Sequence, residues 1–204
     1  MYTALLSTSL TLSTYLRKRL ENDPVLGLLF DPAQGGTLVV SLETPEDMLN
    51  APLNGLSVWL YRITRDPDLL NDPPIRLNPA GYRQAPLPLR LHYLVTPVFV
   101  APAAANSETA QRTLGKVLQS LYDHPVLAGA DLVGDFVGTT TALRARIEPM
   151  TLEEVTRIWN ALEQPYQLCI SYEVTVPLID SDIVDQHTPV ADVIPDYAIV
   201  VDEM

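Results

Sequence analysis

Three carboxylates near the C-terminal end of the sequence, Asp180, Asp182 and Asp185, have the residue type and spacing that could hold a divalent metal ion. Carboxylate oxygens are the ligands that Mg²⁺ and Ca²⁺ prefer. A calcium-binding loop, however, has a glutamate at its twelfth position, and the twelfth residue counted from Asp180 is Ala191. The pattern therefore favours a solvated charged segment, and a small metal-dependent enzyme using these carboxylates stays open as an alternative.

Other residues that could act as nucleophiles or bases are few. Cys169 lies in an apolar strand pattern with no histidine near it in sequence, which is typical of a buried structural thiol. His92 lies in a predicted strand, and His124 ends a predicted helix, where the helix dipole favours a cation without any catalytic role. The sequence has no HExxH or CxxC pair, no GxGxxG, no Walker-type loop and no GxSxG elbow. We therefore predict that the protein is not an enzyme and needs no cofactor or resident metal.

The charge distribution is one-sided. Net charge is −12, which excludes a typical nucleic-acid-binding protein, because such affinity comes from cations that meet phosphates. Residues 158–204 hold nine carboxylates and no Lys or Arg. This imbalance predicts that residues 183–204 form an acidic extension that binds a basic surface on a partner. A solvated tail that only aids solubility is the alternative.

Membrane insertion is not expected. The longest apolar runs fall far short of the roughly 20 residues that a membrane span needs. The cations at 17–19 follow the first apolar stretch, whereas a secretory signal has them in front. We therefore expect a cytosolic start.

Hydrophobic periodicity predicts a single α/β (α+β) domain over residues 1–182. Its sheet is expected to be mixed or antiparallel, with four to five strands flanked by three helices. A capping box, in which Thr151 and Glu154 satisfy each other's backbone amides, marks the start of the last helix. We expect helices over 3–21, 107–122 and 151–162, and strands over 37–42, 56–65, 87–98, 142–148 and 168–179.

The stretch 66–88 contains six prolines in 23 positions. That composition predicts a long loop without regular structure, and loops of such length inside a domain are usually functional or disordered. The strands on either side of it, 56–65 and 87–98, are expected to pair antiparallel. Arg76 and Arg83 give the loop a sign opposite to that of the acidic C-terminal quarter.

Four sequence patches in this order are similar to one known family. They are LSVWLYRITRDP at 56–67, APLPLRLHYLVTP at 85–97, GKVLQSLYDHPVL at 115–127, and TLEEV at 151–155 followed by PYQLCISYEV at 165–174. Together they resemble the cap proteins of extracellular contractile injection systems, typified by the Photorhabdus virulence cassette and the antifeeding prophage. The resemblance extends over about residues 3–182. Longer members have a further C-terminal domain that this chain lacks.

The resemblance implies a tail-terminator-like fold and a mechanical role. Such a cap forms a six-fold ring on the distal end of the inner tube and contractile sheath, ends their polymerisation and anchors the last sheath layer. Its partners would be further copies of itself, the sheath protein and the inner-tube protein, with no nucleic acid. It would assemble in the cytoplasm as part of a phage-tail-like particle, released or intracellular.

Two segments are the expected interfaces. We expect the proline-rich loop to contact a neighbour in the ring and the C-terminal segment to reach a sheath subunit, for instance by adding a strand to its sheet. A terminator or connector of an ordinary phage tail or type VI machine is the related alternative, and an adaptor with a pocket lined by Trp59 and Tyr93 is another. The candidate interface residues are Arg65, Asp66, Arg76, Arg83, Asp180, Asp182, Asp185, Val190 and Tyr197.

Overall fold

In a computed structural model, which describes residues 2–69, 73–78, 81–99, 107–175, 179 and 181–186, one sheet has the strand order β1-β2-β5-β8-β7-β6. Neighbouring strands are antiparallel except β1 and β2, which are parallel. The predicted fold class is confirmed, with six strands here instead of four to five, because β6 is too short to show alternation. The strands are β1 (Val39–Ser41), β2 (Gly55–Arg65), β5 (Leu89–Val98), β6 (Val126–Ala128), β7 (Ala142–Ile147) and β8 (Ile170–Thr175).

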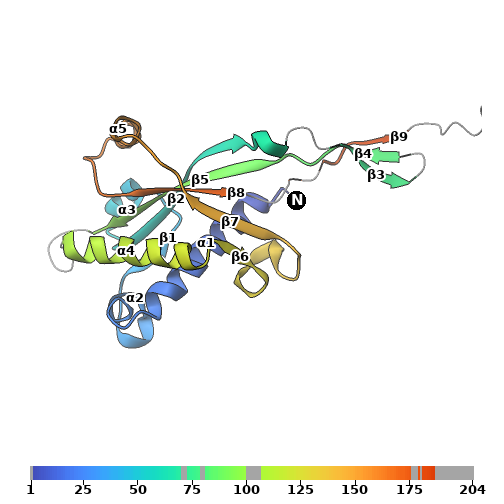
Figure 1. Ribbon diagram of the computed structural model, residues 1–204. Helices are drawn as coiled ribbons and strands as arrows, with labels where there is room; N and C mark the ends of the chain where they lie inside the picture. Colours follow the sequence, from blue (N-terminus) through green and yellow to red (C-terminus); the bar gives the residue numbers. More distant parts are fainter. Residues whose placement is uncertain are drawn as a thin grey trace, which may run out of the picture.

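Helices cover both faces of this sheet. Figure 1 shows α1 and α4 on one face and α5 on the other. The three helices predicted from periodicity are present, and two shorter ones join them. The helices are α1 (Ala4–Glu21), α2 (Gly27–Phe30), α3 (Pro45–Asn50), α4 (Ser107–Asp123) and α5 (Leu152–Ala161). Short 3₁₀ turns lie at Pro32–Gln34, Pro67–Leu69, Gly129–Asp131 and Gly134–Phe136.

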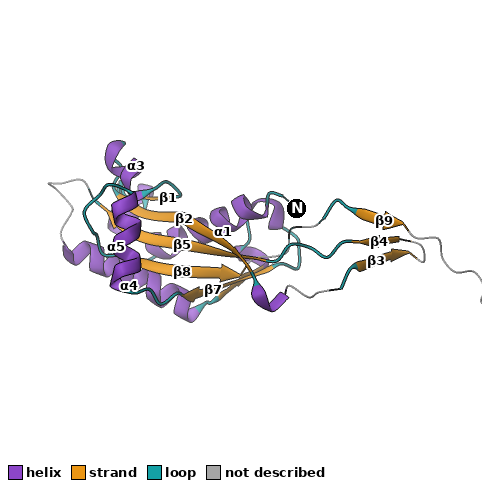
Figure 2. Ribbon diagram, turned by 90° about the horizontal axis from the view of Figure 1, so that it is seen from above, coloured by secondary structure: helices purple, strands orange, loops and turns teal. Residues whose placement is uncertain are grey.

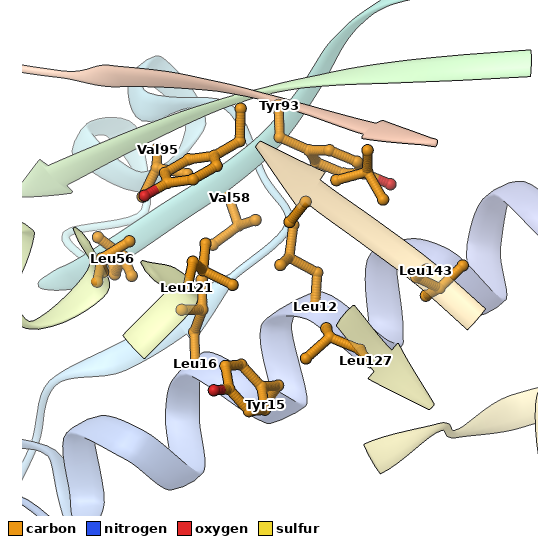
Figure 3. Close-up of a cluster of buried hydrophobic side chains, with 14 of the residues drawn as sticks. Leu12, Tyr15, Leu16, Leu56, Val58, Tyr93, Val95, Leu121, Leu127 and Leu143 are labelled. Carbon is orange, nitrogen blue, oxygen red and sulfur yellow. The ribbon is translucent and has the colours of Figure 1, made fainter. Parts of the chain in front are cut away.

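The main core lies between α1, α4 and the sheet. Leu12 and Leu16 of α1 point toward Val58 and Tyr93 of the central strands, and Leu121 of α4 closes the cluster (Figure 3). All five side chains are at most 2% exposed. Burying a leucine side chain this completely contributes roughly 2 kcal/mol, so the leucine stripe of α1 accounts for much of its stability.

The serines and threonines of α1 also lie in the interior, which explains a helix with mediocre intrinsic propensity. The hydroxyls of Ser9 and Tyr93 are 2.7 Å apart. Ser7 Oγ and Thr11 Oγ1 accept hydrogen bonds from the backbone amides of Asp135 and Val133. Tertiary contacts therefore hold α1 in place, and α1 in turn fixes the loop of residues 129–138.

The opposite face of the sheet has a smaller core under α5. The predicted capping box is present, with Glu154 N donating to Thr151 Oγ1 and Thr151 N donating to Glu154 Oε2. Trp159 of α5 packs on Leu94 of β5. Cys169 lies half-buried beside this cluster, and burial raises the pKa of its thiol, as expected of a structural cysteine.

A thin arm projects from one end of the body (Figure 2). It is a three-stranded antiparallel sheet of order β3-β4-β9, formed by β3 (Ile75–Asn78), β4 (Gly81–Arg83) and β9 (Val184–Gln186). The prediction of no regular structure over 66–88 is therefore wrong. The prolines of this stretch lie outside the two strands and flank them, which is where sheets tolerate proline.

Candidate interface site

The base of the arm is fixed by a buried ion pair. Asp66 follows the last residue of β2 and is 3% exposed. Arg90 Nη2 of β5 lies 2.6 Å from Asp66 Oδ1, and the Asp66 amide donates to the Pro88 carbonyl. The hydrogen bond from Arg90 holds the pKa of Asp66 below its ordinary value, so the carboxylate is charged at neutral pH. Asp66 is one of the predicted interface residues, and in this structure it ties the two strands at the arm's root together.

The same arginine extends the network across the sheet. Arg90 also contacts Asp68 at 2.6 Å and Glu173 of β8 at 3.7 Å. Glu173 in turn accepts from Arg146 of β7 at 2.5 Å. Charged side chains therefore link β2, β5, β8 and β7 at the end of the body that faces the arm.

The arm carries exposed apolar side chains as well as two arginines. Ile75, Arg83 and Val184 are cross-strand neighbours and so share one face. Ile75, Leu77 and Val184 are 38%, 48% and 48% exposed. On the other face the Arg76 guanidinium lies 5.9 Å from the centre of the Tyr82 ring. Three exposed apolar side chains on a thin projecting sheet are what a contact surface requires.

The structure brings the two predicted segments together in one sheet. Arg76 and Arg83 lie in β3 and β4, and the backbone of Asp185 in β9 pairs with Tyr82. Arg65 ends β2 and lines a hollow of about 340 Å³ at the root of the arm, between residues 84–88 and Ile179. The prediction treated the loop and the C-terminal segment as separate surfaces, and the β4–β9 pairing joins them. Asp180, Val190 and Tyr197 lie outside the described residues.

The carboxylates considered for a metal are only partly described. Asp182 is exposed, and the side chain of Asp185 is outside what the structure describes, as is all of Asp180. Over the described residues no group of three or more His, Cys, Asp and Glu side chains could hold a metal ion. No helix in the described part of the chain is long and apolar enough to cross a membrane.

A second polar cluster, which sequence reasoning missed, centres on Glu148. Its carboxylate accepts hydrogen bonds from Tyr61 at 2.9 Å and Ser171 at 2.7 Å, contacts His92 Nδ1 at 2.9 Å, and pairs with Arg62. Burial alone would raise the pKa of Glu148, but the bonds from Ser171, His92 and Tyr61 outweigh it and hold that pKa below its ordinary value. Burial raises the pKa of Tyr61 to about 12, so the phenol stays protonated.

The cluster depends on an irregularity in β2. The register between β2 and β5 shifts between Leu60 and Arg62, which leaves Tyr61 as an extra residue. Such bulges redirect side chains. Here the bulge allows both Tyr61 and Arg62 to reach Glu148. His92 and Glu148 are 56 positions apart, so only the strand register could have paired them.

Thr64, His92 and Glu148 supply, in this order, the hydroxyl, imidazole and carboxylate groups of a proton relay. Thr64 Oγ1 lies 2.9 Å from His92 Nε2. His92, however, is only 3% exposed, so its ring nitrogens are occupied by protein groups and turned away from solvent. The arrangement favours a structural clasp that joins β2, β5, β8 and the residue after β7.

The comparisons with known proteins agree with the fold. The sequence model described as the Pvc16 N-terminal domain matches residues 7–192. The chain is similar to the sheath/tube terminator of an extracellular contractile injection system, PVC, in its extended state, with a TM-score of 0.64 and 18% identity over 98% of this chain and 65% of that one. It is also similar to the tube-terminating cap of the anti-feeding prophage, with a TM-score of 0.60 and 20% identity over 97% of this chain and 61% of that one.

The coverage and the sequence identity of these matches determine what can be concluded from them. The chain spans less than two thirds of the length of either solved chain. At 18% and 20% identity the likeness is one of fold. No curated protein matches the sequence.

Proposed function

The chain belongs to the Pvc16 N-terminal domain family, and on that premise we propose that it is the structural cap, or tail terminator, of a phage-tail-like contractile injection system. It forms a ring on the distal end of the inner tube and contractile sheath, ends their polymerisation and anchors the last sheath layer. The observation that carries this proposal is the family match over residues 7–192, together with a fold shared with two terminators.

The arm is the element that closes the ring. A cyclic ring needs a heterologous interface, in which one patch of each subunit meets a different patch of the next. The exposed apolar side chains of the arm, Ile75, Leu77 and Val184, supply the first patch because the arm projects beyond the body (Figure 2). The number of subunits we propose is six, which follows from the resemblance to six-fold caps.

The ion pairs at the root of the arm are suited to transmitting force between the arm and the body. A cap on a contracting sheath must keep its arms in place while the sheath layers move. Arg90 connects Asp66 at the arm's root to Glu173 in the body, so a pull on the arm is shared among several strands. The cluster around Glu148 links β5 and β8 a second time, because Glu148 contacts His92 of β5 and Ser171 of β8.

The function needs no catalysis, cofactor or metal. The partners are further copies of the chain, the sheath protein and the inner-tube protein of the same particle. Assembly takes place in the cytoplasm, and the finished cap is a component of the particle.

Light scattering behind size exclusion, over a range of concentrations, tests self-assembly. We expect a species near six times the 22.5 kDa mass of one chain. A stable dimer that does not grow with concentration would contradict a closing head-to-tail ring. A monomer would restrict the proposal to a ring that forms on a tube end, which electron microscopy of capped tubes then decides.

A further inference from the structure

The side of α1 that faces solvent is apolar, although the helix buries many hydroxyls. Within residues 4–16 the exposed side chains are Leu6 and Leu10, at 57% and 37%. A surface helix normally turns its polar side chains to water and its apolar stripe to the core. In α1 five serines and threonines are buried instead, namely Ser7, Thr8, Ser9, Thr11 and Ser13. The fold of one subunit therefore gives no reason for leucine at positions 6 and 10.

Tyr2 continues this line of side chains just before the helix. It precedes Leu6 by the same four positions that separate Leu6 from Leu10, and residues four apart are neighbours on a helical surface. Tyr2 is 88% exposed, so three successive points of the line present large apolar side chains to solvent. A rise of 1.5 Å per residue gives the line a length of about 12 Å. We call Tyr2, Leu6 and Leu10 the α1 patch.

A loop with two carboxylates flanks the α1 patch. The Asp135 amide donates to Ser7 Oγ at 3.2 Å, so the loop of residues 129–138 lies against the first half of α1. This loop contains Asp131 and Asp135 and no Lys or Arg, and residues 2–10 contain no charged side chain. Among the described residues neither carboxylate forms an ion pair. The patch is therefore apolar with a negative border.

The arm has the complementary character. Its hairpin, residues 75–83, contains two arginines and no Asp or Glu. Ile75, Arg83 and Val184 are cross-strand neighbours, so an apolar side chain lies on either side of an arginine. Neighbouring strands are about 4.8 Å apart, so this row is about 10 Å long, which is close to the length of the α1 patch.

The arm of one subunit does not lie on its own α1 patch. Figures 1 and 2 show the start of α1 at the end of the body from which the arm leaves, and the arm projects away from it. A second copy must therefore supply the arm that covers the patch. Because the arm and the patch are different surfaces of the chain, such a contact is heterologous, as a closed ring requires.

We infer that the α1 patch binds the arm of a second copy of this chain. Ile75 and Val184 of the arm pack against the leucines of the patch, and the arginines of the hairpin meet the carboxylates of the loop of residues 129–138. The inference rests on the proposed ring, and it identifies the surface of the neighbouring subunit that receives the arm.

Mixing two variants that each lack one surface tests this contact, with solution mass measured by light scattering. The arm variant, Ile75→Thr with Val184→Thr, and the patch variant, Leu6→Gln with Leu10→Gln, should each need at least about tenfold higher concentration than the wild type to associate. A 1:1 mixture still holds one intact arm and one intact patch, so it should form a two-subunit species and nothing larger. Glutamine is nearly as good a helix former as leucine, so the patch variant should keep its helical circular dichroism. Leu152→Gln, at a 71% exposed position of α5, is the matched control and should associate like the wild type.

Disulfide formation between copies with one cysteine each locates the contact. In a Cys169→Ala background, copies with Leu6→Cys are mixed with copies with Ile75→Cys under mild oxidation. A disulfide between the two kinds of copy should form. The control pair of Leu152→Cys with Ile75→Cys should stay reduced.

Three results would overturn the inference: a wild type that stays monomeric up to its solubility limit, a mixture that stays monomeric, or a patch variant that assembles like the wild type. In the last case the proposed function survives, because the ring still forms and only the receptor of the arm is wrong. Capping of tubes is measured separately. A two-subunit species in the mixture, with tube ends left uncapped by the wild type, would keep this contact and reject the proposed function.

Discussion

Arg90 Nη2 lies 2.6 Å from Asp66 Oδ1 at the point where β2 leaves the body and the arm begins. Arg90 is on β5, the strand that returns from the arm, so the pair joins the outgoing and incoming chain at the root. Without it, the long excursion between β2 and β5 would be held mainly by backbone hydrogen bonds such as Asp66 to Pro88. The buried ion pair therefore holds the root of the arm together with the backbone bonds of Asp66 to Pro88 and between Leu87 and Ile179.

Replacing Asp66 with asparagine should destabilise the protein and loosen the arm. Asparagine keeps the shape but leaves Arg90 without its buried counter-charge, which should lower the free energy of unfolding by about 1–3 kcal/mol. Urea unfolding measures the loss, and limited proteolysis should cut residues 66–88 faster. The control is Asp68→Asn, whose side chain is 81% exposed and should change stability by less than about 0.5 kcal/mol. Equal effects of the two variants would mean that something other than the buried ion pair stabilises the root of the arm.

Polar substitution on the arm should abolish ring closure without unfolding the subunit. In Ile75→Thr with Leu77→Thr, two exposed apolar side chains are lost, so stability should change by less than about 1 kcal/mol. Solution mass should fall to that of the monomer. Ile63→Thr, at a 47% exposed position of β2, is the matched control and should assemble normally. Assembly by the double variant would place the ring contact elsewhere.

The Glu148 clasp should make stability fall in acid. Because the folded-state pKa of Glu148 is lower than its ordinary value of 4.5, its contribution is complete above that pH and is lost as the pH falls through the folded-state pKa. Glu148→Gln should lower the free energy of unfolding at pH 7 by about 1–3 kcal/mol and flatten its decline below about pH 4.5. Urea unfolding at a series of pH values measures both. Exposed Glu153→Gln should leave the wild-type profile unchanged, and an equally steep decline in Glu148→Gln would reject this role.

The Ser9–Tyr93 hydrogen bond should couple α1 to the sheet. Burial raises the pKa of Tyr93, so its phenol remains neutral and able to donate. Tyr93→Phe should cost about 1 kcal/mol, and adding Ser9→Ala should cost less than the sum of the two single changes. Thermal or urea unfolding of the four proteins in the cycle gives the coupling. Strict additivity would show that the two hydroxyls, 2.7 Å apart, act independently.

Elements with a strong period could be predicted from the sequence. The leucines of α1 repeat at helical spacing, and Thr151 with Glu154 marks the first turn of α5, so both helices were placed within a residue or two. The antiparallel pairing of β2 with β5 also followed from two long alternating strands around one connection. In each case the signal lies within a short window of residues.

Features that depend on long-range pairing could not be predicted. β9 is three residues long and pairs with β4 about a hundred positions earlier, so nothing local indicates the partnership. The hairpin of β3 and β4 was not predicted, because the high proline content of residues 66–88 was taken to exclude strands throughout. The prolines in fact flank the two strands. Glu148 and His92 meet only because of strand register and a bulge at Tyr61. Leu152 of α5 is an apolar residue in the first turn of the helix and is nevertheless 71% exposed, which helical periodicity alone does not indicate.

The most direct test of the central claim is electron microscopy of inner tubes and sheaths assembled from the proteins of the same particle, with and without this chain. The account predicts that the chain binds at one end of each tube as a ring of additional density and that tube lengths become bounded. The Ile75→Thr, Leu77→Thr variant should leave those ends uncapped. Tubes of the same unbounded length, with no density at either end in the presence of the wild-type chain, would contradict a role as terminator.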